Sequence, residues 1–483
     1  MAAQKFGVES GEIDAFMASM KLPRILGDFL VGGALYFALV PSLQAVRHSH
    51  GESAALGLAL HAVKRIVVAL ALVSVFYFLF PASCIEFVAP GLTSHQAGLT
   101  VMLARLVSPL FVLMSLVLLA TGFIQSYRHF AVLGVASIIP GLTQLLFLAL
   151  FASDIGVASW ASGMLVGVLL RFLVLGGIFA LVIREHGVSP PPPDTKKRMW
   201  RLVMAIGGAV LLGRTNLIVQ SRLASTVTGG LALVSYATAL SGMMVSLAIG
   251  PFLIALYPLL TQQAAREKPE SMDKNASLGI RTAIFVLIPI VLVVFLHRRE
   301  IVRFLFERGQ FGSEDTLVLS ALLGVYACGA FLLVFQNVLT KVFYGAQDVK
   351  TILVLGAVHA VAAIILNGLL FRTWSLIGLA VANAGVVGVR VIVGLWVLKR
   401  RGRQLVPVKD IGTYSRLGLA AVGSSVLHRL IFIFLLPQRA IPLFFEICIG
   451  VLAVSIPYIL ACWALRIREL KLIIDRLTSY VRK

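Results

Sequence analysis

Residues 66–80 read IVVALALVSVFYFLF, fifteen consecutive positions without a charged side chain. A strand of a membrane barrel alternates apolar and polar residues with a period of two, and this stretch does not, so it predicts a helix. Apolar blocks of roughly 20 residues, the length that crosses about 30 Å of hydrocarbon, recur along the chain. Only helices and closed barrels satisfy their backbone polar groups in lipid. The pattern therefore predicts an all-α polytopic membrane protein.

The composition of the 483 residues agrees with this fold class. The chain is 59% hydrophobic and 13% charged, whereas a soluble domain is about 45–50% apolar and about 25% charged. This balance excludes a soluble enzyme, a coiled coil and a disordered chain. The four cysteines are isolated, and neither a C-x-x-C nor an H-E-x-x-H pattern occurs, so we predict no disulfide framework, no metal site and no cofactor.

Apolar blocks between loop signals predict 13 membrane spans. Their approximate limits are 14–46, 62–88, 99–124, 130–151, 156–183, 199–223, 229–258, 278–296, 316–345, 351–371, 374–398, 413–436 and 441–465. One alternate set of loops carries most of the lysines and arginines, which assigns it, with the C-terminus, to the cytoplasmic side of the membrane. The net charge of +21 then reflects this bias and not nucleic-acid binding.

Two features depart from a simple topology. Residues 1–13 fall outside although they contain no apolar leader, and we hypothesise that a span belonging upstream is missing. Residues 297–316, HRREIVRFLFERGQFGSEDT, place four arginines outside, and their apolar residues cluster between positions 301 and 306. We expect a short amphipathic helix lying in the outer interface.

The chain also carries an internal duplication at an offset of about 217 residues. GALYFALVPSL at 33–43 overlies GPFLIALYPLL at 250–260 with five identities in eleven. We predict an N-terminal lobe over 1–183, a Pro-rich cytoplasmic linker over 184–198, a C-terminal lobe over 199–399, and a terminal helix pair with a basic tail over 400–483. Each lobe of such a parallel repeat holds six spans, the first lobe lacking one here. Transporters built this way place their substrate site between the lobes.

Ionisable residues inside a predicted span are costly and mark functional candidates. The first span carries Asp14, Lys21, Arg24 and Asp28, which fall within about 80° of one another on a helix. This face either lines a polar cavity or holds an Arg24–Asp28 pair at the water boundary.

Two further arginines lie in the middle of predicted spans, Arg171 and Arg214. Excess arginine suits a phosphate-bearing anionic substrate. The predicted spans between 199 and 399 contain no Asp or Glu, which argues against a drug–cation antiporter. No G-x-x-x-x-G-K-[ST] motif occurs, so the protein is predicted to be a secondary or facilitated transporter and not an enzyme.

Five stretches then resemble the MurJ/MviN family, the lipid II flippases of the MOP exporter superfamily. They are LFERGQFGSEDT (305–316), FYGAQDVKT (343–351), DAFMASMKLPRIL (14–26), ALVPSL (38–43) and ARLVSPLFVLMSLVLLATGFIQSYRHFAV (104–132). The resemblance implies 14 spans in two six-span lobes plus a terminal pair. It also implies a monomer in the bacterial inner membrane that flips an undecaprenyl-pyrophosphate-linked saccharide, with membrane lipid around it.

The resemblance also assigns residues to roles. It implies a structural or gating role for the motif residues Glu307, Arg308, Gly309, Asp348 and Lys350. Asp14 is retained, but the family's arginine pair is replaced by Gly27–Asp28, its Y-A-D-R stretch reads YATA at 236–239, and an expected aspartate is Gln220. We hypothesise that Lys21, Arg24, Arg171 and Arg214 restore a cationic substrate-binding surface beside Asp14. The alternatives are a flippase for another polyprenyl-linked oligosaccharide, such as an O-antigen or exopolysaccharide unit, and a degenerate, non-transporting scaffold.

Overall fold

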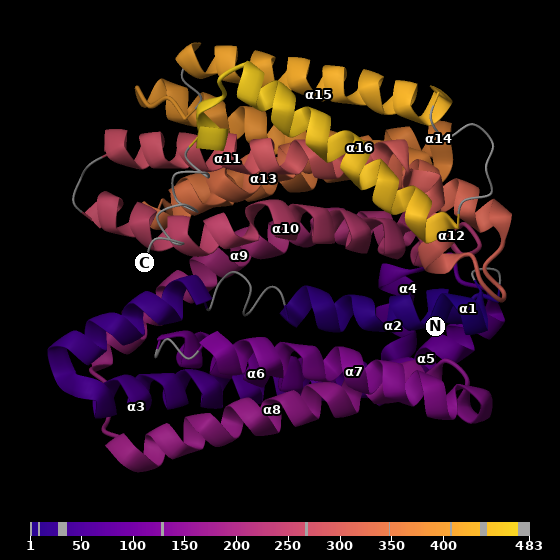
Figure 1. Cartoon of the computed structure of the whole chain (residues 1–483). Coiled ribbons are helices and arrows are strands. Elements are labelled where there is room, and N and C mark those ends of the chain that lie inside the picture. Colours follow the sequence, from indigo (N-terminus) through magenta and orange to yellow (C-terminus); the bar gives the residue numbers. More distant parts are fainter. Residues whose placement is uncertain are drawn as a thin grey trace. The chain divides into compact units, whose positions relative to one another are not determined.

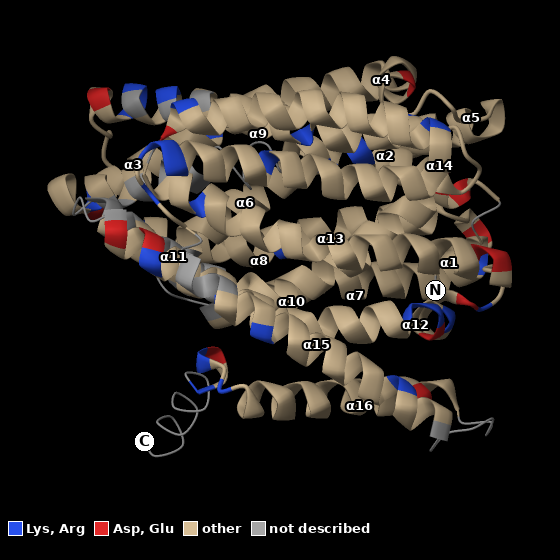
Figure 2. Cartoon of the chain, turned by 90° about the horizontal axis from the view of Figure 1, so that it is seen from above, with Lys and Arg blue, Asp and Glu red and all other residues tan. Residues whose placement is uncertain are grey.

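The computed structural model describes residues 2–7, 10–27, 36–126, 130–265, 269–346, 348–405, 408–434 and 442–471. Within these ranges the chain is almost entirely helical and contains no strand (Figure 1). Charged residues lie mostly near helix ends, and long stretches of helix contain none (Figure 2). The predicted all-α membrane class is confirmed.

Sixteen helices follow one another in the described ranges. They are α1 (Ala2–Phe6), α2 (Glu12–Gly27), α3 (Tyr36–Leu79), α4 (Pro81–Val88), α5 (Ser94–Val107), α6 (Leu110–Ser126), α7 (Phe130–Ile155), α8 (Ala158–His186), α9 (Pro193–Ala224), α10 (Gly230–Ala265), α11 (Pro269–Leu296), α12 (Arg298–Phe306), α13 (Ser313–Gly345), α14 (Val349–Arg400), α15 (Val408–Phe434) and α16 (Leu443–Ala464). In the described part of the chain, ten helices are long and apolar enough to cross a membrane, or eleven if the bent pair α5–α6 forms one span.

Helix α14 is two spans joined by a reversal. Its 52 residues would be about 80 Å long if straight, more than twice the hydrocarbon thickness. Ser375 breaks it with φ 50°, close to the predicted boundary between the spans 351–371 and 374–398. An Oδ2 of Asp348, before the helix, lies 2.5 Å from Nη1 of Arg401, after it. Its two ends therefore meet, as in a helical hairpin.

The sequence predicted a loop between the spans 14–46 and 62–88, but the structure has a helix there. Residues on both sides of Gly51 are helical, and only Gly51 itself, at φ 83° and ψ 177°, departs from helical geometry inside α3. Arg47 Nε pairs with Glu52 Oε2 at 2.7 Å across this break. Charged residues such as Arg and Glu are good helix formers, so a charged connection need not be a loop.

Two other predicted spans are broken at prolines. The span predicted over 62–88 is divided at Phe80 into α3 and α4, with Pro81 at the first turn of α4. The span predicted over 99–124 is divided into α5 and α6, which bend by 44°. Pro109 has no backbone N–H to continue the ladder. The carbonyl of Arg105, four residues before Pro109, instead accepts a hydrogen bond of 2.9 Å from the hydroxyl of Ser108.

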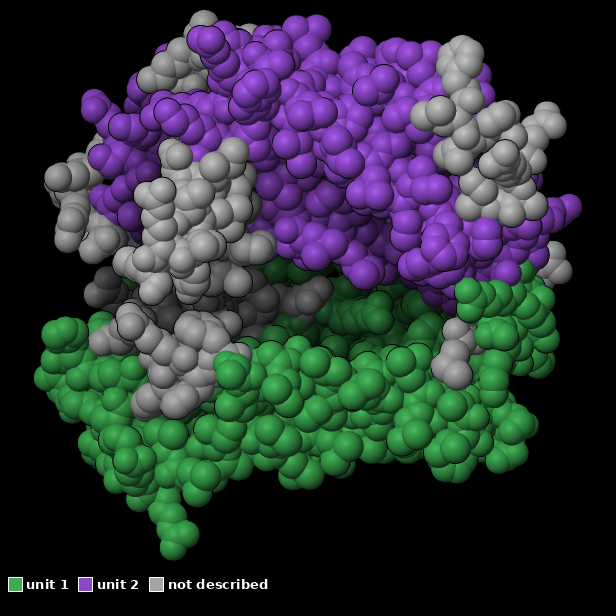
Figure 3. Space-filling model, in the orientation of Figure 1, with its two compact units in different colours: residues 1–232, 308–311, 352–368 green, residues 233–307, 312–351, 369–483 purple. Residues whose placement is uncertain are grey.

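The chain folds into two compact units, drawn in separate colours in Figure 3. Unit 1 comprises residues 1–232, 308–311 and 352–368, and unit 2 comprises 233–307, 312–351 and 369–483. The core of unit 1 includes the close pair α7 and α8, where a Cβ on Gly167 would come within 2.7 Å of Pro140 Cα. In unit 2, the Tyr458 hydroxyl of α16 donates to the Phe285 carbonyl of α11 at 3.1 Å.

Candidate functional site

Asp14 is buried near the start of α2, with 1% of its surface exposed. Its Oδ1 accepts a hydrogen bond of 2.7 Å from the backbone N–H of Ala232, in the first turn of α10. A helix N-terminus leaves its first N–H groups unpaired and carries a partial positive charge, so a carboxylate is favourable there. Asp14 therefore caps a helix that follows it by more than two hundred residues.

Lys21 and Arg24 continue the polar face of α2. Lys21 lies two turns beyond Asp14 on the same face and is half-buried, whereas Arg24 is exposed. Asp28 lies outside the described residues, so the proposed Arg24–Asp28 pair stays a prediction. The structure thus gives α2 a buried anion at one end and a less buried cationic stretch at the other.

Arg171 lies near the middle of the apolar helix α8 and is half-buried. Its Nε is buried and has no hydrogen-bond partner within the described residues. Trp160, three turns earlier on roughly the same face, stacks on Phe16 of α2 with ring centroids 4.3 Å apart. Arg171 therefore shares the side of α8 from which Trp160 reaches α2.

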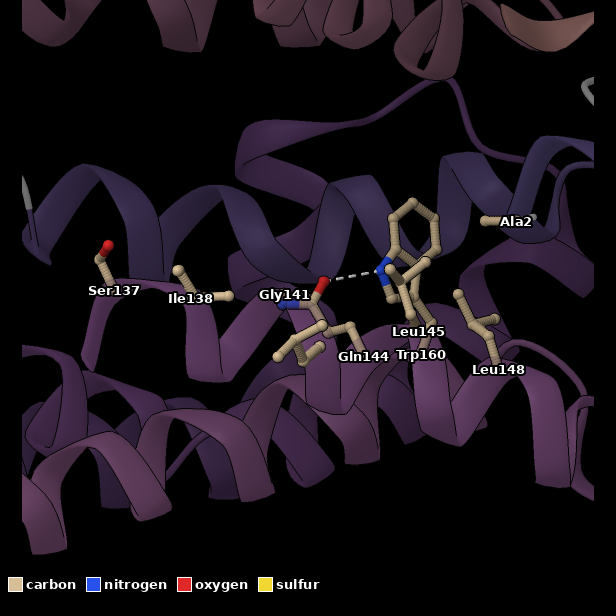
Figure 4. A pocket seen from close by; sticks show the side chains of 9 residues that line it. Ala2, Ser137, Ile138, Gly141, Gln144, Leu145, Leu148 and Trp160 are labelled. Atoms are coloured by element: carbon tan, nitrogen blue, oxygen red, sulfur yellow. Dashed lines mark hydrogen bonds between the residues drawn. The ribbon is translucent and has the colours of Figure 1, made fainter. Parts of the chain in front are cut away.

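Beside Trp160 lies a cavity of about 550 Å³ lined by Ala2 and by residues of α7 (Figure 4). The Trp160 indole Nε1–H donates to Oε1 of Gln144 at 2.9 Å, as the dashed line in Figure 4 shows. These two polar side chains satisfy one another, and the rest of the lining is mostly apolar. None of the predicted binding residues lines this cavity, so we do not assign the substrate to it.

Arg214 lies on α9 and is half-buried. Two residues later, Asn216 meets Asn367 of α14, whose Nδ2 donates to Asn216 Oδ1 at 2.8 Å. Residues two apart on a helix point in nearly opposite directions, so Arg214 is not part of this contact. Elsewhere α9 packs on α2, α3 and α4. All five predicted substrate-binding residues lie in unit 1, on the three helices α2, α8 and α9.

The motif around Gly309 forms a turn against α1, both within unit 1. Gly309 has φ 64°, and a Cβ there would overlap the backbone oxygen of Gln4. The same oxygen accepts a hydrogen bond of 3.1 Å from the Gln310 N–H. Glu307 ends α12, with an Oε1 that lies 3.6 Å from Arg303 Nε, and Arg308 follows it. Glycine is required at 309 by both conformation and space.

The second motif stabilises the α14 hairpin. Asp348 caps α14 by accepting from the Thr351 N–H at 3.2 Å and also binds Arg401. Partial burial alone would raise the pKa of Asp348, but the hydrogen bonds from Thr351 and Arg401 outweigh it and hold this pKa below its ordinary value. Lys350 is exposed. The acid of this motif thus caps α14 and joins its two ends, while the structural or gating role of the motif stays a prediction.

The structure also contains polar contacts that the sequence did not predict. The Asn216–Asn367 pair is buried, and polar residues in apolar helices are the signal that could have found it. In unit 2, the Nε2 atoms of His297 and His428 lie 2.8 Å apart in a buried pair. In the part of the chain that is described, no group of three His, Cys, Asp or Glu side chains is arranged to hold a metal ion.

Comparison with known proteins gives one consistent family. The family model described as "Lipid II flippase MurJ" matches residues 2–427. The probable lipid II flippase MurJ of Rhizobium tropici is 27% identical over 409 residues, which cover 80% of this chain and 75% of that protein. The lipid II flippase MurJ of Burkholderia cenocepacia is 26% identical over 367 residues, or 73% of this chain and 70% of that protein.

Solved structures share the fold. A lipid II flippase MurJ in an inward closed conformation superposes over 95% of this chain and 93% of its own length, with a TM-score of 0.75 and 19% identity. An inward-facing MATE multidrug transporter of the MOP superfamily covers 82% of this chain and 90% of its own length, with a TM-score of 0.66 and 14% identity. The family model spans nearly the whole sequence, and this chain therefore belongs to the MurJ family.

Proposed function

We propose that this protein is a lipid II flippase, which moves the undecaprenyl-pyrophosphate-linked peptidoglycan precursor from the cytoplasmic to the periplasmic leaflet of the inner membrane. The observation that carries the proposal is the family match over residues 2–427. The protein acts as a monomer with a cytoplasmic C-terminus. Its two lobes, residues 1–183 and 199–399, expose the substrate alternately to the two sides of the membrane.

The cations of unit 1 are the residues that recognise the substrate's pyrophosphate in this proposal. Lys21, Arg24, Arg171 and Arg214 lie on three helices of one unit, and guanidinium groups bind phosphate through directional hydrogen bonds. Arg171 supports the assignment best, because its buried Nε still has a hydrogen bond to donate. A negatively charged ligand is the chemistry that satisfies such a group.

Asp14 has a positioning role in this scheme. Its carboxylate is engaged by the backbone of Ala232 and holds the start of α10. Asp14→Asn keeps an oxygen that can accept this bond but loses the charge, whereas Asp14→Ala leaves a buried N–H without its partner, at a cost of about 1–3 kcal/mol. We expect Asp14→Ala to lower both thermal stability and flippase activity, and Asp14→Asn to lower both less. If Asp14→Ala keeps its full thermal stability but loses flippase activity, Asp14 instead binds the substrate.

Complementation of a flippase-depleted strain tests the function. The native chain should restore growth and prevent lipid II from accumulating at the cytoplasmic face. Arg171→Gln and Arg214→Ala should fail at normal expression, while Lys197→Gln, an exposed cation at the start of α9, should complement. Failure of the native chain, with lipid II still accumulating, would favour another polyprenyl-linked substrate or a scaffold. Normal complementation by Arg214→Ala would remove that residue from the site.

A further inference from the structure

Unit 1 contains a second cavity, of about 390 Å³, among α3, α6 and α8. Every residue that lines it is apolar. Phe123 of α6 and Phe179 of α8 meet edge to face at its wall, with ring centroids 4.5 Å apart. Gly177 leaves open space, since a Cβ there would contact nothing within 4 Å. Leu173, at its rim, is 57% exposed, so the cavity opens on the surface of the unit.

Two cations lie close in sequence to residues that line this cavity. Val63 lines the cavity and is followed by Lys64, and Ala180 lines it one helical turn before Arg184. Both cations are exposed, and neither makes an ion pair among the described residues. Arg184 lies near the end of α8, and Lys64 lies at the start of the predicted span 62–88; the loop charges assign both positions to the cytoplasmic side. The region therefore combines an apolar cavity with two exposed cations nearby in sequence, on the side assigned to the cytoplasm.

We propose that this cavity binds one acyl chain of an anionic phospholipid of the cytoplasmic leaflet, whose phosphate is held by Lys64 and Arg184. The volume holds about a dozen groups the size of a water molecule or a methylene, which matches one acyl chain and not a long polyprenyl tail. The apolar lining offers nothing to a polar ligand. The long side chains of Lys and Arg reach from an apolar surface to the headgroup layer.

Native mass spectrometry of the full chain tests this site. The protein in detergent is given phosphatidylglycerol or phosphatidylcholine with identical acyl chains. We expect phosphatidylglycerol to be retained in preference, and Gly177→Leu, which fills the slot, to reduce that retention at least fivefold. Gly134→Leu on α7 is the matched control, because a Cβ there also meets nothing within 4 Å. Lys64→Gln and Arg184→Gln should each reduce the preference about fivefold.

Four results would overturn the proposal. Equal retention by the native protein and Gly177→Leu would place the bound lipid elsewhere. Equal retention of the two phospholipids would remove the anionic headgroup from the assignment. Displacement of phosphatidylglycerol by polyprenyl phosphate, with the same sensitivity to Gly177→Leu, would make the occupant a substrate tail. If the native protein forms a dimer and Gly177→Leu does not, the occupant of the cavity is a second copy of the chain. All four results come from measurements of binding or assembly, so they do not depend on whether the protein flips lipid II.

Discussion

Replacing Gly309 by alanine tests the contact between the turn at 308–311 and α1. Gly309 adopts φ 64°, a left-handed conformation that costs a residue with a Cβ about 1–2 kcal/mol. The added Cβ would also lie 3.0 Å from Gln4 Cγ and overlap the Gln4 carbonyl oxygen. Because the overlap involves backbone, the turn must move away from α1. This movement breaks the hydrogen bond from Gln310 N–H to Gln4, which is worth about 1 kcal/mol.

The two costs together lower the local opening free energy at Gln310 by about 2–3 kcal/mol. Hydrogen exchange of the peptide that contains Gln310 measures this directly, since exchange reports local opening. We expect the exchange rate to rise roughly 30- to 150-fold at neutral pH. The protein is otherwise helical on both sides of the turn, so the acceleration should be confined to residues 308–311 and the end of α1.

Two glycines provide controls for this experiment. Gly402→Ala carries the conformational cost alone, because Gly402 has φ 71° but open space around it, and its neighbour Arg403 should exchange roughly 5- to 30-fold faster. Gly312→Ala, at φ −89° with open space, should leave the exchange of Gln310 unchanged. If Gly309→Ala accelerates exchange no more than Gly402→Ala does, the overlap with Gln4 does not exist and the reasoning is wrong.

Further predictions concern the polar groups of Asp348, Asn367 and His297. Asp348→Asn keeps the helix cap but loses the partly exposed Arg401 pair, so stability should fall by no more than about 1 kcal/mol. Hydrogen bonds hold the pKa of Asp348 below its ordinary value. The stability that the Arg401 pair adds should therefore be lost only as the pH falls through this lowered pKa. Thermal unfolding of Asp348→Asn should lack this part of the pH dependence. Asn367→Leu removes the donor to Asn216 and should cost about 1 kcal/mol, measured by the same unfolding in detergent. Burial lowers the pKa of His297, so stability should be full above about pH 6.5 and fall as acid is added, and His297→Gln should flatten this dependence.

The sequence predicted the helices well and their interruptions only in part. Hydrophobic length is set residue by residue, so it is visible without a structure. The divisions at Phe80 and Ser108 precede Pro81 and Pro109, and these prolines could have predicted them. The helical connection around Gly51 could not be read from charge, because charge reports a wet surface and not a loop.

The candidate site, too, was predictable from the sequence only in part. Asp14 was found as an acid on a polar helix face, but its partner is the backbone of Ala232, 218 residues away. A backbone N–H has no sequence signature. The same holds for Gly309, whose partner is the carbonyl of Gln4. Side-chain patterns therefore identify candidate functional residues. Their three-dimensional contacts are needed to distinguish a residue that binds substrate from one that positions another element.

The arginines of this chain differ in what balances their charge. Arg403 forms a two-pronged pair with Asp273 of α11, with Nη2 and Oδ1 2.6 Å apart, and Arg401 binds Asp348. The Arg401–Asp348 pair is partly exposed, and the mostly buried Arg403–Asp273 pair is balanced within itself by two opposite charges. Arg171 lies in the middle of an apolar helix, where a cation costs about 2.5–3.5 kcal/mol on insertion scales, and its Nε has no partner within the described residues. Such a cost is not recovered by the fold itself. An anion that arrives during transport can recover it, and this is why we assign Arg171, and not the paired arginines, to the pyrophosphate.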